Sequence, residues 1–438
     1  MSSLPTADPY VPGHGDPSYA VRHYDLGLTY ALEGNRLDGR AVLAIEVLAE
    51  TDRLVLDLAH LGVDKVRVQG AKLKKHATRQ HRLVLTLADE AEVGDELTVT
   101  VSYSGKPRPV DVKHLGDAGW EELTDGVIVA AQPHGAPTWY PCNDRPDDKA
   151  TYRMELTVSA GYAVVANGVR RSHRRGGSTE TWVYEQDEPM ATYLATVQIG
   201  RYVDRVVPAA PSGVPVRVTA PADVDPDLLD LTFGRHHEML AAFEDRFGPY
   251  PFPGYTAVIT GDELEIPLES QSLSTFGRNF VRDDWDAERL VAHELAHQWF
   301  GNAVTLRRWQ DIWLHEGFAC YSEWLWSEAS GREPAADHAR RHHRRLAEKR
   351  EDLLLADPGP DLMFDDRVYK RGACALHVLR GEVGDAAFFD VLRSWVERYA
   401  GSSVTTEDFL AHATEVTGHD VTALLHPWLY DEDLPALG

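Results

Sequence analysis

Hydrophobic and polar residues alternate in short runs along the first half of this chain. Runs with a period of two, separated by turn residues, occur between residues 21 and 202, for example at 53–58, 82–87 and 96–101. Successive side chains of a strand point to opposite faces, so this period is typical of half-buried strands. The pattern predicts an antiparallel β domain over residues 21–205, preceded over residues 1–20 by an extended arm rich in Pro, Gly and Ser.

The period changes after residue 225, where apolar residues recur at helical spacing. Residues 228–247 keep this spacing up to Gly248-Pro249, which predicts a helix, and residues 255–259 resemble a strand. Residues 206–221 contain four prolines and are expected to form a linker, so that residues 222–438 make up a second, mainly α domain. Further helices are expected over residues 290–300, 335–354, 371–381, 386–399, 406–417 and 421–429.

Composition and charge narrow the class of partner. At 438 residues the chain is long enough for two domains, and its formal net charge of −25 argues against nucleic acid or anionic membranes as partners. The three cysteines, Cys142, Cys320 and Cys374, are scattered and do not resemble a disulfide framework. We recognise neither a membrane-spanning stretch nor a signal peptide, so the cytoplasm is the expected compartment.

The strongest chemical signal is a His-Glu-x-x-His motif at residues 293–297, with eighteen residues between it and Glu316. Residues four apart lie on one face of a helix, so His293 and His297 can bind one metal ion. Glu294 is placed to take a proton from water rather than to bind the metal. Glu316 lies near the start of a second expected helix. Two imidazoles and one carboxylate, with a fourth position left to water, are the ligands of a catalytic zinc site.

A His-Glu-x-x-His string also arises by chance in helices that bind no metal. Here it lies in an apolar helix that is expected to end at Gly301. Burying two histidines and a glutamate without a partner would cost free energy, and a zinc ion removes that cost. With the spacing to Glu316, this favours one zinc ion per chain, bound by His293, His297 and Glu316.

Several segments carry a resemblance that extends over nearly the whole chain. Residues 293–302 and 313–319 resemble the aminopeptidase N family, gluzincin metallopeptidases that include the leukotriene hydrolases. Three further segments resemble the family in the same order: Met-Ala-Thr-Tyr-Leu at 190–194, Phe-Gly-Pro-Tyr-Pro at 247–251 and Pro-Trp-Leu-Tyr at 427–430. Such agreement, in order, is far more specific than the zinc motif alone.

The resemblance implies an α+β fold in which a saddle-shaped N-terminal antiparallel β domain precedes a thermolysin-like, mainly α catalytic domain. Larger members continue into a helical C-terminal domain that covers the active site. This chain stops at Gly438, so we expect a short two-domain form with a more open cleft.

The resemblance also implies roles for four residues outside the zinc motif. Tyr369 corresponds to the tyrosine that stabilises the tetrahedral oxyanion, although a core tyrosine beginning a helix would look the same in sequence. Glu269 and Gln132 correspond to residues that bind the free α-amine of the substrate. Glu323, seven residues after Glu316, is expected to accept an N–H from a ligating histidine; the alternative is a surface carboxylate.

The chain departs from the family pattern around Glu269. Ile-Pro-Leu-Glu-Ser at residues 266–270 replaces the family's Gly-Ala-Met-Glu-Asn, and Pro267 has no backbone N–H to offer a substrate. The bulky Ile266 stands where a glycine would let the backbone approach a peptide closely. Glu263 and Glu265 could compete for the amine-binding role, so the amine site is less firmly predicted than the metal site.

The predicted function is that of a zinc aminopeptidase, which hydrolyses peptides with a free amino terminus and releases the N-terminal residue. One alternative is a zinc endopeptidase or non-peptide hydrolase, and another is a non-catalytic scaffold, since some relatives of this family have lost their metal site. The presence of all three ligands, of Glu294 and of Tyr369 argues against the scaffold. The basic run at residues 340–345 is interpreted as a solvated helix face.

Overall fold

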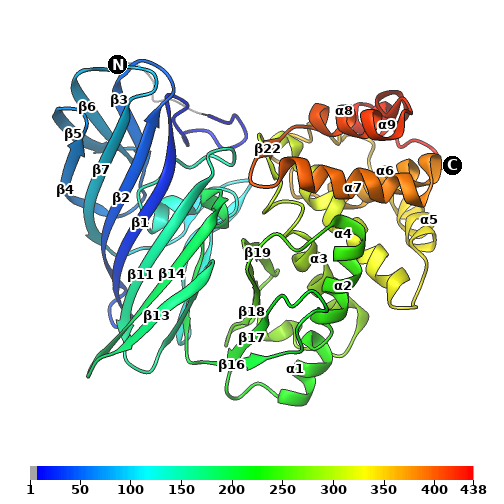
Figure 1. The fold of residues 1–438 in the computed structure, drawn as a ribbon, viewed down its shortest axis with the longest axis horizontal. Helices are drawn as coiled ribbons and strands as arrows, with labels where there is room; N and C mark the ends of the chain where they lie inside the picture. The colour runs from blue at the N-terminus through cyan, green and yellow to red at the C-terminus, as the bar shows by residue number, and fades with distance from the viewer. Residues whose placement is uncertain (1–6, 438) are drawn as a thin grey trace.

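The computed structural model describes residues 7–437, in which a β-rich N-terminal part and a helix-rich C-terminal part lie side by side (Figure 1). This confirms the predicted α+β fold, with mostly antiparallel strands followed by a helical domain. Residues 1–6 of the expected arm lie outside the described part of the chain. None of the helices between residues 7 and 437 is both long and apolar enough to cross a membrane.

Three sheets make up the N-terminal part. Their strand orders are β13-β14-β11-β1-β2-β7-β4, β12-β15-β10-β9-β8 and β3-β6-β5. Neighbouring strands are antiparallel except β1 and β11, which pair in parallel. The strands are β1 (Tyr19–Ala31), β2 (Arg36–Val47), β3 (Thr51–Asp57), β4 (Gly62–Gln69), β5 (Leu73–Arg79), β6 (Arg82–Ala91), β7 (Glu96–Gly105), β8 (Val110–Val112), β9 (Gly116–Leu123), β10 (Gly126–Ala130), β11 (Ala150–Ser159), β12 (Ala163–Ala166), β13 (Val169–Arg175), β14 (Thr179–Met190) and β15 (Val197–Gly200).

The period-two runs of the sequence lie in strands of these sheets. In β7, Leu97, Val99 and Val101 are buried while the intervening threonines are half-buried. Strand β11 shows the same strict alternation along its length. One face of each strand therefore packs on the core, as the alternation predicts.

A five-stranded sheet of order β16-β17-β18-β20-β19 opens the C-terminal part. Residues 216–221, expected to belong to a linker, instead form β17, which pairs in parallel with β18. Three of the four prolines precede this strand and Pro221 is its last residue, so none of them interrupts the ladder of residues 216–219 with β18. The strands of this sheet are β16 (Tyr202–Val206), β17 (Val216–Pro221), β18 (Tyr255–Ile259), β19 (Leu268–Ser270) and β20 (Leu273–Phe276).

The described part of the chain contains nine α-helices, of which α1 and α2 lie between β17 and β18 in the sequence. They are α1 (Pro226–Phe233), α2 (His236–Phe247), α3 (Trp285–Ala296), α4 (Trp313–Ala329), α5 (Ala335–Leu346), α6 (Asp366–Val383), α7 (Asp385–Tyr399), α8 (Thr406–Thr417) and α9 (Val421–Tyr430). A short parallel pair of strands, β21 (Thr305–Leu306) and β22 (Ser403–Val404), connects the segment after α3 to the segment before α8.

Helix existence was predicted better than helix ends. The single helix expected over 228–247 is two helices, because the chain turns at Gly234, whose N–H closes α1 on Asp230. The helix expected over 335–354 ends at Leu346, before a mostly charged, exposed stretch. Helix α6 begins five residues before the expected start because Asp365 caps it through its side chain. Helix α3 ends at Ala296 and not at Gly301.

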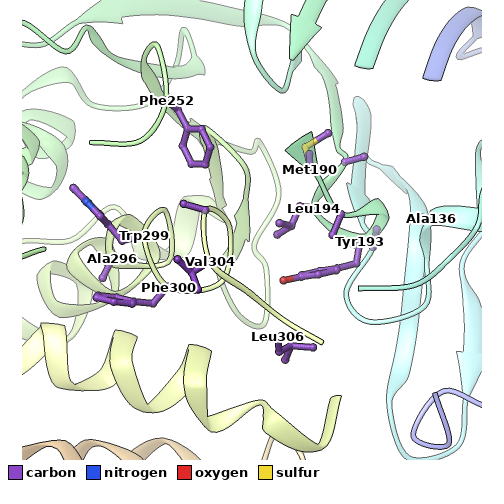
Figure 2. Close-up of a cluster of buried hydrophobic side chains, with 14 of the residues drawn as sticks. Ala136, Met190, Tyr193, Leu194, Phe252, Ala296, Trp299, Phe300, Val304 and Leu306 are labelled. Carbon is purple, nitrogen blue, oxygen red and sulfur yellow. The ribbon is translucent and has the colours of Figure 1, made fainter. Parts of the chain in front are cut away.

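The two parts share one hydrophobic core. Figure 2 shows buried side chains of the N-terminal part, such as Tyr193, gathered near those of the segment around Val304 and Leu306. The Tyr193 hydroxyl donates to the Gly301 carbonyl, and its ring packs edge-on against Trp309. Such a junction holds the two parts in a fixed relation, which fixes the shape of the cleft between them.

A buried lysine crosses the same junction. Lys149, at the end of the loop before β11, places its Nζ 3.0 and 2.9 Å from the carbonyl oxygens of Asn302 and Ala303. The arm also spans both parts, because Asp8 accepts the backbone N–H of Trp309 and His14 pairs with Asp144. Residues 7–18 of the expected arm are therefore packed turns across the two parts.

Candidate active site

His293, on the last turn of helix α3, and His297, the residue that caps this helix, both face a cleft between the two parts of the molecule. The cleft has a volume of about 1330 Å³ and is lined by residues of β9, of the loop before β19 and of helices α3 to α6. His293 and His297 direct their Nε2 atoms toward Glu316, whose Oε2 lies 3.4 and 3.5 Å from them. The three ligand atoms lie within 4.8 Å of one another. This donor set, two imidazole nitrogens and one carboxylate oxygen, fits a zinc ion.

The other nitrogen of each imidazole has a fixed partner. His293 Nδ1 lies 2.8 Å from Glu323 Oε1, and His297 Nδ1 lies 3.0 Å from the Phe300 carbonyl oxygen. Both partners only accept hydrogen bonds, so each Nδ1 donates and each Nε2 keeps its lone pair for a metal. Glu323 thus lies where the sequence analysis expected it.

Two cations that the sequence analysis did not single out fix Glu323 in turn. Arg289 Nη1 donates to Glu323 Oε2 at 3.2 Å, and the Lys370 ammonium lies close enough to act on the same carboxylate. Burial alone would raise the pKa of Glu323, but Lys370 and the hydrogen bond from His293 hold it well below its usual range. Arg289 could have been found from sequence, since it lies one helical turn before His293.

A close approach of two helices brings Tyr369 to Glu316. Gly317 on α4 faces Gly372 on α6, and a Cβ at Gly317 would lie only 2.9 Å from the Gly372 Cα. Each glycine is a turn or less from a predicted site residue, so the contact places the Tyr369 hydroxyl beside the Glu316 carboxylate. Burial raises the pKa of Tyr369, so its hydroxyl stays protonated and can donate a hydrogen bond.

Glu294 is buried and faces the same cleft. Its Oε2 has no hydrogen-bond partner among the described residues, which is rare for a buried carboxylate. Burial raises the pKa of Glu294 above its ordinary value. A carboxylate oxygen left without a protein partner is available to a water molecule or a substrate.

A second, alternative ligand set contains Glu294, Glu269 and His297, whose ligand atoms also lie within 4.8 Å of one another. The first set contains two imidazoles whose Nδ1 atoms have fixed partners, whereas this set contains one such imidazole and two carboxylates. Glu269 also has a different partner, since Gln132 Nε2 donates to its Oε1 at 2.7 Å. We therefore favour His293, His297 and Glu316 as the metal ligands.

Glu269 lies on the edge strand β19, with 8% of its surface exposed. Gln298 and Asn302, which follow the zinc motif, both donate to the Ser270 carbonyl and hold this strand against α3. Glu263 and Glu265, the alternatives for amine binding, are exposed and line the cleft. Ile266 also lines the cleft, with 61% of its surface exposed.

Comparison with known proteins identifies the family. The Peptidase M1 N-terminal domain model matches residues 20–194, and the Peptidase family M1 domain model matches residues 231–428. Aminopeptidase M1-D of Oryza sativa subsp. japonica is 28% identical over 96% of this chain, and leucyl aminopeptidase of Saccharolobus solfataricus is 25% identical over 95% of it. The chain spans about half the length of these curated relatives, 50% and 54% respectively.

Solved structures match over their whole length. The crystal structure of an M1 zinc metallopeptidase from Deinococcus radiodurans superimposes with a TM-score of 0.89 at 30% identity, and 98% of each chain is covered. A mutant M1 zinc metallopeptidase from the same organism, bound to a Tyr-Ser-Ala substrate, superimposes with a TM-score of 0.90 at 31% identity, again with 98% of each chain covered. The chain belongs to peptidase family M1.

Proposed function

We propose that the chain is a zinc-dependent aminopeptidase that removes the N-terminal residue from peptides. The observation that carries this proposal is the convergence, in one cleft, of the His293, His297 and Glu316 ligand atoms with the unpartnered Glu294 carboxylate. The Glu269–Gln132 pair lies in the same cleft and supports an exopeptidase. The expected cytoplasmic location stays a prediction from the sequence.

We assign a separate role in the reaction to each group of the site. A bound zinc ion supplies a Lewis acid that lowers the pKa of water toward about 7 and polarises the scissile carbonyl. Glu294 takes the proton of the attacking water and returns it to the leaving amine. The Tyr369 hydroxyl donates a hydrogen bond to the oxyanion that develops on the scissile carbonyl, a contribution typically worth about 3–4 kcal/mol.

Glu269 and Gln132 set the position of cleavage. The Glu269 carboxylate accepts the substrate ammonium, and the Gln132 side chain fixes the orientation of that carboxylate. Holding the α-amine there leaves room for one residue before the scissile bond, which gives single-residue release. An endopeptidase remains the alternative, and it predicts that a blocked amine makes no difference.

The test is hydrolysis of a panel of aminoacyl-p-nitroanilides, each with a free and an acetylated amine, with and without a chelator. We expect chelator-sensitive cleavage of the free amines only. The Glu294→Gln variant serves as the control, because it should retain zinc and lose about 10³-fold or more in kcat. Equal cleavage of acetylated substrates would support the endopeptidase, and full activity of Glu294→Gln would contradict the mechanism.

A further inference from the structure

Charge is unevenly distributed over the lining of the cleft. The segments of β9 and of the loop through β19 contribute carboxylates and no lysine or arginine. Helices α3, α5 and α6 and the residues that follow α5 contribute the lysines and arginines, and the same region, together with α4, contributes six further carboxylates, Asp286, Glu294, Glu316, Glu323, Glu348 and Asp366. We call the first set the acidic side, which comprises Asp117, Glu121, Glu263, Glu265 and Glu269, and the second the basic side, which comprises Arg289, Arg341, Arg345, Lys349, Arg367 and Lys370.

Most cations of the basic side already have anionic partners. Arg289 pairs with Glu323 and Asp286, Arg341 pairs with Glu333, and Arg367 forms ion pairs with Asp365 and Asp352. Arg345 and Lys349 differ, because neither side chain forms an ion pair or hydrogen bond with any residue between 7 and 437. Both are exposed and both line the cleft.

Arg345 belongs to the basic run that the sequence analysis interpreted as a solvated face. The structure divides this run, because Arg341, His342 and Arg345 line the cleft whereas Arg344 does not. Arg341 and Arg345 are four residues apart on α5, a spacing at which like charges repel by about 0.2–0.5 kcal/mol. An anion bound between them would relieve that repulsion.

The pKa of His342 is sensitive to the charges of the basic side. Its ring stacks on Trp324, with centroids 5.4 Å apart. Burial, together with the charges of Lys370 and Arg341, lowers the pKa of His342 to about 3. The charges of Lys370, Arg341 and Arg345 therefore act on His342 in the same direction as burial, and the Glu323 carboxylate opposes them.

The amine site lies beside His297 and the basic side lies beside His293. The ligand atoms of Glu269 and His297 lie within 4.8 Å of each other, whereas Glu323, which Arg289 contacts, lies 2.8 Å from His293 Nδ1. Glu323 is followed on α4 by Trp324, on which His342 of α5 stacks, and Arg345 lies one turn beyond His342. A peptide whose amine is held at Glu269 and whose scissile bond lies at the histidines would extend its leaving part toward Arg345.

We propose that Arg345, with Lys349 beside it, binds a carboxylate on the leaving-group side of the substrate, so that short or acidic peptides are preferred. The inference rests on the proposed aminopeptidase function and specifies its substrate class. A guanidinium suits this role because it can bind a carboxylate through two parallel N–H donors. The carboxylate can be the C-terminus of a short peptide or the side chain of Asp or Glu.

The experiment measures kcat/KM for leucyl peptides of two to five residues. One series compares free C-terminal acids with the corresponding amides, and a second compares glutamate with glutamine at each position of the amidated peptides. We expect at least one acid to exceed its neutral counterpart by about five-fold at low salt, the upper range of an exposed ion pair. The first series identifies a terminal carboxylate and the second identifies a side-chain carboxylate.

The variants Arg345→Ala, Arg345→Lys and Arg344→Ala locate the effect. Arg345→Ala should lose the preference, Arg345→Lys should keep part of it, and Arg344→Ala, with the same charge change on the same helix, should keep all of it. A wild-type ratio near one in both series, or an equal loss in Arg344→Ala, overturns the inference. If leucyl-p-nitroanilide, which has no carboxylate, is not hydrolysed either, the proposed function itself fails and the inference falls with it.

Discussion

The acidic and basic sides of the cleft differ in what they require of a ligand. The acidic side is negatively charged, like the chain as a whole. The net acidity of the protein therefore accounts for most of these carboxylates without a bound ligand. Glu269 is the exception there, because it is buried and has an ordered partner in Gln132. The basic side contains carboxylates as well as cations, and two of its exposed cations, Arg345 and Lys349, form no ion pair with a residue between 7 and 437. Burial therefore distinguishes the proposed functional group on the acidic side, and the absence of an ion pair distinguishes it on the basic side.

Replacement of Glu269 tests the acidic side with the largest expected effect. In Glu269→Ala the substrate ammonium loses its buried carboxylate, and we expect kcat/KM for free-amine anilides to fall by about 10²-fold, equivalent to about 2.7 kcal/mol. Acetylated anilides carry no ammonium and should remain uncleaved in both the wild type and the variant. The measurement is the ratio of kcat/KM for the free-amine anilides between the wild type and the variant.

The matched controls are Glu263→Ala and Glu265→Ala, which remove exposed carboxylates from the same side of the cleft. Each should lower kcat/KM for the free-amine anilides by less than about five-fold, the range of an exposed ion pair. A larger loss in either control than in Glu269→Ala would show that the amine is bound by that glutamate and not by Glu269. It would also mean that the altered segment at residues 266–270 has moved the amine site.

The parts of the site that local spacing determines could be predicted from the sequence. A four-residue spacing on one helix places His293 and His297 together, and their Nε2 atoms do face one carboxylate. The Glu323 carboxylate likewise lies in direct contact with His293, as predicted. Tyr369 required the resemblance, because its place beside Glu316 depends on the contact between Gly317 and Gly372 on two different helices.

What was missed depends on where elements end and on contacts between distant segments. The turn at Gly234 and the strand β17 depend on hydrogen bonds that hydrophobic spacing does not encode. The basic run was interpreted as a solvated face, since its charges alone do not show that α5 borders the cleft. The role of Lys149 at the junction could not be predicted from the sequence, because its partners are backbone carbonyls more than 150 residues away.

Replacement of Lys149 tests how much the junction between the two parts contributes to stability. Lys149→Ala should lower the free energy of unfolding by about 2–3 kcal/mol, because it leaves a cavity at the junction. Lys149→Met fills most of that space and should cost less than about 1 kcal/mol. Its carbonyl partner on Ala303 keeps another donor, the Gly401 N–H. Denaturant unfolding of the two variants measures the difference.

The pH dependence of the same pair gives a second measurement. Burial lowers the pKa of the Lys149 ammonium to about 7, below its ordinary 10.5. Between these values the unfolded chain binds the proton more tightly, so the stability contributed by Lys149 rises as the pH increases from about 7 to 10. The wild type should therefore gain stability relative to Lys149→Met over this range. A constant difference would show that Lys149 stays charged in the folded protein.

The smallest expected effect concerns the exposed carboxylates of the acidic side. Glu263 and Glu265 line the cleft on the side of Glu269, so they face the region where the first residue of a substrate would lie. They should favour arginine over glutamate as that first residue, and the double variant Glu263→Gln, Glu265→Gln should reduce the preference by about two- to five-fold. Because both groups are exposed, the effect should vanish near 1 M salt, where the Debye length is about 3 Å. A preference that survives high salt would instead be due to a buried carboxylate, and Glu269 is the buried carboxylate of this side. The contrast between the sides would then rest on buried rather than exposed charge.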